Sequence, residues 1–161
     1  MLAKTLGLPF VDGDDLHPPS NVDKMSRGIP LTDEDRQPWL DSIRQCIVDQ
    51  DGDGPPSRGI VVACSALKKT YRDSLRGGND PAESAVSTYF VFLQGSQDLL
   101  LERLQQRTGH FMKAQMLESQ LATLENPCGE PGVVTVPVEW STEEQVQHVA
   151  GYLERVHVVV A

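Results

Sequence analysis

The chain has 161 residues, which is enough for one domain with a buried core. Its formal net charge of −9 at pH 7 argues against nonspecific nucleic-acid binding, and no apolar run approaches the roughly 20 residues that a membrane-spanning helix needs. The first ten residues lack the apolar core of a secretory signal, and three scattered cysteines without a Cys-x-x-Cys pair favour a reducing, cytoplasmic setting over a disulfide framework or a zinc site.

The first half of the chain alternates between helical and strand patterns. In order, these patterns predict a helix end at 2–6, an apolar strand at 8–11, an amphipathic helix at 33–50, a strand at 59–67 and a helix at about 68–76. Gly7 is the expected stop of the first helix, and Pro38 is expected in the first turn of the second, where proline is tolerated. The strand at 59–67 is β-branched and apolar, which predicts burial on both faces.

The second half continues the alternation. It predicts a buried strand at 89–95, a helix at 96–107 capped by its serine, a helix at 113–125, a strand at 133–138 and a helix from 141 to about 155. Ser141 and Glu144 have the spacing of a capping box. Loops are expected at 51–58 and 77–87. Strands that alternate with helices predict an α/β fold with a mainly parallel sheet flanked by helices.

Polar residues follow two of the predicted strands. Asp12 and Asp14 come directly after the apolar run at 8–11, and the segment 65–69 follows the strand at 59–67. Ligands of such sheets bind beyond the carboxyl ends of the strands. We therefore expect both groups at one edge of the sheet, where they would form a site.

A partial calcium-loop pattern occurs at 49–54. Its acidic residues alternate as a calcium loop requires, but the twelfth position, which needs a bidentate glutamate, is Ile60. Two prolines stiffen the second half of the segment. The sequence therefore favours a solvated loop over a calcium site.

The cluster at 12–17 is a candidate for catalysis. Asp12 and Asp14 alternate, so an extended backbone would let one face a metal and the other a substrate. His17 lies just beyond them. The alternative is a helix cap followed by a turn, since aspartate and proline are common in both.

Two sets of cations are candidates for anion binding. Lys68, Arg72 and Arg76 are spaced four apart on one helical face, just after Ser65, and could receive an anion. The spacing of Arg103 and Arg107 is the same, and Gly109 could act as a lid hinge. Two arginines on one face can hold phosphate oxygens during phosphoryl transfer. Solvated basic faces are the alternative for both sets.

Three segments, 12–40, 63–76 and 109–125, together resemble the gluconokinase family of small P-loop kinases, which are related in fold to nucleoside-monophosphate kinases. The resemblance covers about residues 2 to 155 and implies a P-loop NTPase fold. It also implies ATP-dependent phosphorylation of D-gluconate to 6-phospho-D-gluconate with Mg²⁺. The implied partners are the sugar acid and ATP, with no nucleic acid or membrane, and related kinases are often homodimers.

The resemblance also implies roles for individual residues. Asp14 would contact the reacting hydroxyl as the base, and Asp12 would act on the magnesium side. Arg103 and Arg107 would face the nucleotide phosphates. The residues implied in holding gluconate are His17, Lys24, Arg36, Ser65, Lys68, Arg72 and His110. Both histidines have a purely structural alternative.

The chain departs from the family in one respect. No G-x-x-x-x-G-K-[ST] loop occurs, and the resemblance begins at about Leu2, within the helix that should follow that loop. We therefore expect a single kinase domain over 1–161 that is incomplete at its N-terminus, with a lid at about 103–125. Reduced stability and little kinase activity are expected, whether the chain is a truncated product or a gluconate-binding or partner-binding relic.

Overall fold

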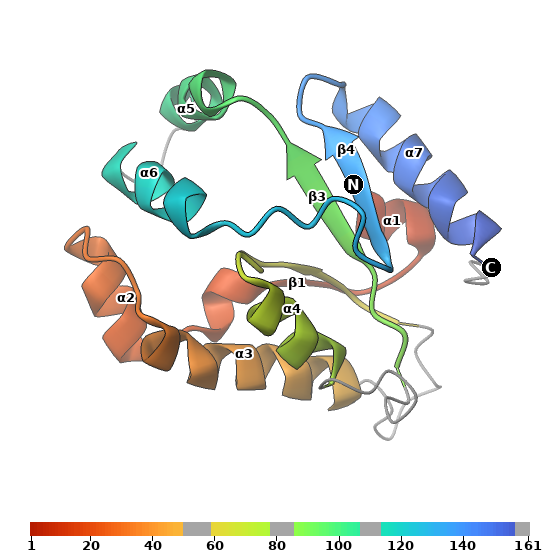
Figure 1. The fold of residues 1–161 in the computed structure, drawn as a ribbon. Coiled ribbons are helices and arrows are strands. Elements are labelled where there is room, and N and C mark those ends of the chain that lie inside the picture. The colour runs from red at the N-terminus through yellow and green to blue at the C-terminus, as the bar shows by residue number, and fades with distance from the viewer. Residues whose placement is uncertain (50–58, 78–85, 107–113, 157–161) are drawn as a thin grey trace.

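The computed structural model describes residues 1–49, 59–77, 86–106 and 114–156, and Figure 1 shows their arrangement. Helices and strands alternate along the chain, as predicted. The elements are α1 (Leu2–Leu6), β1 (Phe10–Asp12), the 3₁₀ helix η1 (Gly13–Leu16), α2 (Pro19–Ser26), α3 (Asp33–Val48), β2 (Val61–Ala63), α4 (Lys69–Arg76), β3 (Phe90–Gln94), α5 (Gln97–Gln106), α6 (Ala114–Thr123), β4 (Val133–Pro137) and α7 (Thr142–Arg155).

All strand pairing among the described residues is parallel. β1 pairs with β2 in a register that places Asp12 opposite Ala63. β3 pairs with β4 in a second two-stranded sheet, and the two strands run side by side in Figure 1. Parallel strands need helical crossovers, which the intervening helices supply. The predicted α/β class is therefore confirmed.

The strands are less buried than predicted. The strand expected over 59–67 is limited to β2, whose residues are half-buried or exposed. In β3, Val91 and Leu93 are 38% and 51% exposed. The prediction of strands buried on both faces was wrong because, within the part of the chain that the structure describes, each sheet has only two strands and leaves edges and faces uncovered.

Two apolar clusters hold the elements together. The first joins α3 to α4 and the segment before it, and its buried members are Trp39, Leu40, Ile43, Leu67, Tyr71 and Leu75. The second joins α1 and α7 to β4, and its buried members are Leu6, Val134, Val136, Val149 and Leu153. Complete burial of such a side chain contributes about 1.5–3 kcal/mol. The first cluster fixes the relative position of α3 and α4, which carry Arg36 and Arg72 of the predicted site.

Several helix ends follow the sequence prediction. Gly7 ends α1 with φ 66°, a left-handed conformation that favours glycine. Ser141 and Glu144 form the predicted capping box of α7. Pro38 was expected in the first turn of α3, which is wrong. A capping box between Thr32 and Asp35 fixes the start of this helix, so Pro38 lies in its second turn. Proline has no backbone N–H, so one helical hydrogen bond is missing there.

Some predictions fall outside the described residues or concern the whole chain. Most of the segment 49–54, rejected as a calcium loop, lies beyond them, as do most of the loops expected at 51–58 and 77–87. Among the described helices, none is both long and apolar enough to span a bilayer.

Candidate active site

The ends of β1 and β2 meet at Gly13. A Cβ atom on this glycine would lie 2.6 Å from the carbonyl oxygen of Ala63, so no other residue fits without a shift of the backbone. The Gly13 carbonyl oxygen accepts a 2.7 Å hydrogen bond from Trp39 Nε1, which ties this junction to α3. The parallel register places the residues that follow both strands at one edge of the sheet, and this confirms the predicted common edge.

The two aspartates after β1 differ in their surroundings. Asp12 is the N-cap of η1, and its Oδ1 atom accepts a 3.1 Å hydrogen bond from the backbone N–H of Asp14. The capping alternative therefore applies to Asp12. Asp14 is exposed; after burial, its negative charge is the second cause of the raised pKa of Cys64, and it opposes the lowering of the His17 pKa. Asp14 thus lies close to the residues that end η1 and β2.

His17 lies flat against Trp39. Their ring centroids are 4.5 Å apart and the rings are nearly parallel, at 10°. Nδ2 of Asn21 lies 3.4 Å from His17 Nδ1, and the same amide nitrogen donates a 2.7 Å bond to the carbonyl oxygen of Asp35. Burial lowers the pKa of His17, with the positive charge of Arg36 acting in the same direction and Asp14 opposing. The imidazole is therefore neutral at pH 7, and its Nε2 atom can act as a donor.

Arg36 is a buried cation without an anionic partner among the described residues. Its side chain comes from α3, and the residue is only 6% exposed. Its NH1 atom lies 3.4 Å from Ser65 Oγ, and its Cζ atom lies 5.8 Å from the ring centroid of Tyr71. None of the ion pairs between described residues includes it. Because a buried charge needs a counter-charge, this guanidinium is suited to an anionic ligand.

Lys68, by contrast, is already paired. Its Nζ atom contacts both carboxylate oxygens of Asp33 at 2.7 Å, and the same carboxylate accepts a hydrogen bond from the Tyr71 hydroxyl. These bonds lower the pKa of Asp33, with Lys68 as the main cause. Burial, followed by the bond to Asp33, raises the pKa of Tyr71 to about 12. Asp33 is therefore ionised and Tyr71 neutral at pH 7.

Two other predicted substrate residues are engaged within the protein. Lys24 contacts both carboxylate oxygens of Asp35, at 2.8 and 2.7 Å. Arg72 is 1% exposed and forms an ion pair with Glu130. It also donates hydrogen bonds to backbone carbonyl oxygens of two segments, one before α4 and one after α6. Those carbonyl oxygens belong to Ala66, Leu67 and Glu125. Arg72 therefore joins the segment before α4 to the segment after α6.

Sequence reasoning missed the cap of α4. The backbone N–H of Lys69, in the first turn, donates a 2.6 Å bond to Oε2 of Glu125, and the backbone N–H of Glu125 donates to the Leu67 carbonyl oxygen. These residues are more than fifty positions apart in the sequence. No local pattern signals a cap from so far away.

The predicted lid is described only in part. Arg103 lies exposed on α5, and α5 contacts α6. In Figure 1 these two helices are neighbours at one end of the molecule. Arg107, Gly109 and His110 lie outside the described residues, so their predicted roles stay predictions.

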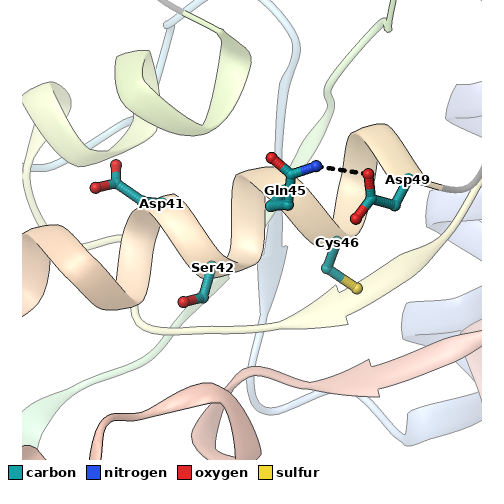
Figure 2. A pocket seen from close by; sticks show the side chains of 5 residues that line it. All are labelled: Asp41, Ser42, Gln45, Cys46 and Asp49. Carbon is teal, nitrogen blue, oxygen red and sulfur yellow. Dashed lines mark hydrogen bonds between the residues drawn. The ribbon is translucent and has the colours of Figure 1, made fainter.

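One open hollow lies elsewhere, along α3. Figure 2 shows its lining side chains, Asp41, Ser42, Gln45, Cys46 and Asp49. The hollow has a volume of about 610 Å³, and its lining residues lie on the second half of this one helix, with Asp49 as its C-cap. It contains none of the predicted site residues. A surface formed by one helix offers no converging groups, so the strand edge is the better candidate site.

Comparison with known proteins gives consistent results. No family model matches the chain. The chain is 49% identical over 138 residues to a gluconokinase from Gluconobacter oxydans, covering 86% of this chain and 72% of that protein. It is 42% identical over 138 residues to the thermosensitive gluconokinase of Escherichia coli, covering 85% and 69% of the two chains.

Solved structures show the same relationship. A crystal structure of a gluconokinase from Sinorhizobium meliloti superposes with a TM-score of 0.80 at 47% identity, covering 96% of this chain and 82% of the other. An unliganded sugar kinase from Janibacter superposes with a TM-score of 0.82 at 38% identity, covering 99% and 87%. At these identities the likeness extends beyond the fold.

Proposed function

The chain belongs to the gluconokinase family, and on that premise we propose that it transfers the γ-phosphoryl group of ATP to D-gluconate, giving 6-phospho-D-gluconate. The family resemblance seen in the sequence is thereby confirmed. The observation that supports a sugar-acid substrate most directly is Arg36, a buried guanidinium that no described carboxylate neutralises. It lies against Ser65, at the strand edge that also carries Asp14.

Arg36 is our candidate for binding the carboxylate of gluconate. A guanidinium offers donors in a planar fork that matches a carboxylate, and burial strengthens such a pair. Ser65 and the neutral His17 supply hydroxyl and imidazole groups for the sugar hydroxyls. The stacked Trp39 holds the imidazole plane in place. This division of roles lets one charged group and several neutral donors recognise an acidic polyol.

Asp14 is our candidate base. Its exposed carboxylate can accept the proton of the 6-hydroxyl as that oxygen attacks phosphorus. Asp12 is our candidate on the magnesium side. The described residues include no group of three acidic, histidine or cysteine side chains suited to a metal, but Mg²⁺ in kinases commonly uses one or two carboxylates together with phosphates and water. Asp12 would supply one such carboxylate, and the ion would neutralise phosphate charge.

The remaining predicted residues receive refined roles. Because Lys24 and Arg72 are paired within the protein, we assign them to holding α2 and α4 in position. Arg103 and Arg107 stay proposed to face the nucleotide phosphates and His110 to hold gluconate, within a lid at about 103–125 of a single domain. A cytoplasmic setting and a homodimer are further proposals that rest on the family.

The proposal is tested by ligand binding with and without the carboxylate. Calorimetry would compare D-gluconate with D-glucitol, which has a hydroxyl group in place of the carboxylate. We expect Arg36→Met to weaken gluconate binding by about a hundredfold, since charge-assisted hydrogen bonds to a partly buried carboxylate contribute roughly 1.5–3 kcal/mol. Glucitol binding should change little. Arg27→Met, which removes an arginine from an exposed ion pair on α2, is the control.

Equal losses for gluconate and glucitol in Arg36→Met would contradict the assignment. Phosphoryl transfer is measured separately, as gluconate-dependent formation of ADP and 6-phosphogluconate. Gluconate binding without transfer would favour the alternative of a binding protein, and absence of both would overturn the proposed function.

A further inference from the structure

Two cations of the site share one aromatic ring. The Cζ atom of Arg36 lies 5.8 Å from the ring centroid of Tyr71, and Nζ of Lys68 lies 5.7 Å from the same centroid. Tyr71 is 5% exposed, so it is a fixed part of the first apolar cluster. Both positive groups are therefore held against one fixed ring.

The two cations differ in their charge balance. Arg36 has no carboxylate partner among the described residues, whereas Lys68 is bound by both oxygens of Asp33. The Tyr71 hydroxyl donates to the same carboxylate and adds a third bond that holds it beside Lys68. The site thus contains two cations, and of these only Arg36 has no described carboxylate within ion-pair distance.

Asp33 is a residue to which the sequence patterns and the family resemblance gave no role. It is the first residue of α3, and its side chain is 59% exposed. Exposure leaves the pair open to ligand on one side, while the helix N-terminus favours a negative charge there. The Asp33 carboxylate therefore stays ionised, and it lies at the surface beside Lys68.

We propose that Asp33 is a specificity-determining residue that restricts the site to sugar acids with one carboxylate, because it neutralises Lys68. This inference rests on the proposed function. A monoacid such as gluconate pairs with Arg36 and meets no second free charge. A diacid would bring its second carboxylate to a lysine that is already paired, next to the negative charge of Asp33, and like charges in such a site repel.

Removal of the Asp33 charge should release Lys68 for a second carboxylate. Asp33→Asn keeps the size of the side chain and its position at the start of α3. The matched control is Glu34→Gln, which removes the same charge from the next position in the same exposed first turn. Asp33→Glu is the conservative variant that retains the charge and should retain the selectivity.

Calorimetry at pH 7 and low salt would measure each variant with D-gluconate and with D-glucarate, which carries a second carboxylate on a chain of the same length. The unmodified protein should bind gluconate more tightly than glucarate. Asp33→Asn should shift the ratio of the two affinities by about tenfold toward glucarate, the size of one added ion pair with a partly desolvated lysine. Its gluconate affinity should be equal or higher, while Glu34→Gln and Asp33→Glu should keep the original ratio.

The results separate this inference from the proposed function. If the unmodified protein binds gluconate and Asp33→Asn leaves the ratio unchanged, the inference is wrong and the proposed function stands. The same holds if Asp33→Asn loses gluconate binding while Glu34→Gln keeps it, because Asp33 would then be needed to present Lys68 to the substrate. If the unmodified protein does not bind gluconate, both fail.

Discussion

Replacement of Arg72 by methionine should destabilise the protein more than any loss of a surface charge. Arg72 is 1% exposed, forms an ion pair with Glu130, and donates to three backbone carbonyl oxygens. Removal of one partner of a buried pair costs about 3–5 kcal/mol, because the other charge stays behind in a poor environment. For a domain of this size, that corresponds to a fall in Tm of about 6–20 °C.

Thermal and urea unfolding would measure the loss, with Arg27→Met as the matched control. Arg27 pairs with Asp23 on the surface of α2, where both side chains are more than half exposed, so little change is expected. The loss should also depend on pH. Arg72 is the main cause of the lowered pKa of Glu130, so the pair stabilises the native state above the unfolded pKa of that carboxyl and the effect fades as pH falls through the lower folded value.

A stability of Arg72→Met within about 1 kcal/mol of the unmodified protein would refute the reasoning. So would an unchanged pH profile between pH 5 and pH 2, since Glu130 would then lack the proposed coupling. A variant that folds stably but loses only gluconate binding would instead return Arg72 to the substrate-binding role expected from the family.

Two further predictions concern the strand edge. Gly13→Ala should lower the free energy of unfolding by about 1–3 kcal/mol and weaken gluconate binding, because the new Cβ would lie 2.6 Å from the Ala63 carbonyl oxygen and push the two strand ends apart. Urea unfolding would measure the stability and calorimetry the binding. Unchanged values for both would contradict the close contact of the strand ends at Gly13. The pKa of His17 is lower in the folded protein than in the unfolded chain, so the unfolded chain is protonated at a higher pH. The free energy of unfolding should therefore fall as the pH drops from about 6.5 to the folded pKa. His17→Gln should flatten that part of the urea-unfolding profile, and a slope that persists would assign it to another group.

Local chemistry made much of the fold predictable. Gly7 and the capping box at Ser141 mark helix ends through backbone conformation and hydrogen bonds within a few residues. The placement of Asp14 and Ser65 after two parallel strands was also predictable, because the carboxyl ends of parallel strands share an edge. Such features depend on neighbours in the sequence, so the sequence displays them directly.

The state of each charge in the site was not predictable in this way. The sequence shows Arg36, Lys68 and Arg72 as similar cations, but folding leaves the first without a described carboxylate, pairs the second with Asp33 and buries the third against Glu130. The partners of Lys68 and Arg72 lie 35 and 58 positions away.

The sequence alone thus determined the family, the order of elements and the residues gathered at one edge. Tertiary structure decided which of the gathered charges is available to a ligand. The physical reason is that a cation's availability depends on burial and on the nearest carboxylate, and both are set by packing between segments that are distant in the chain.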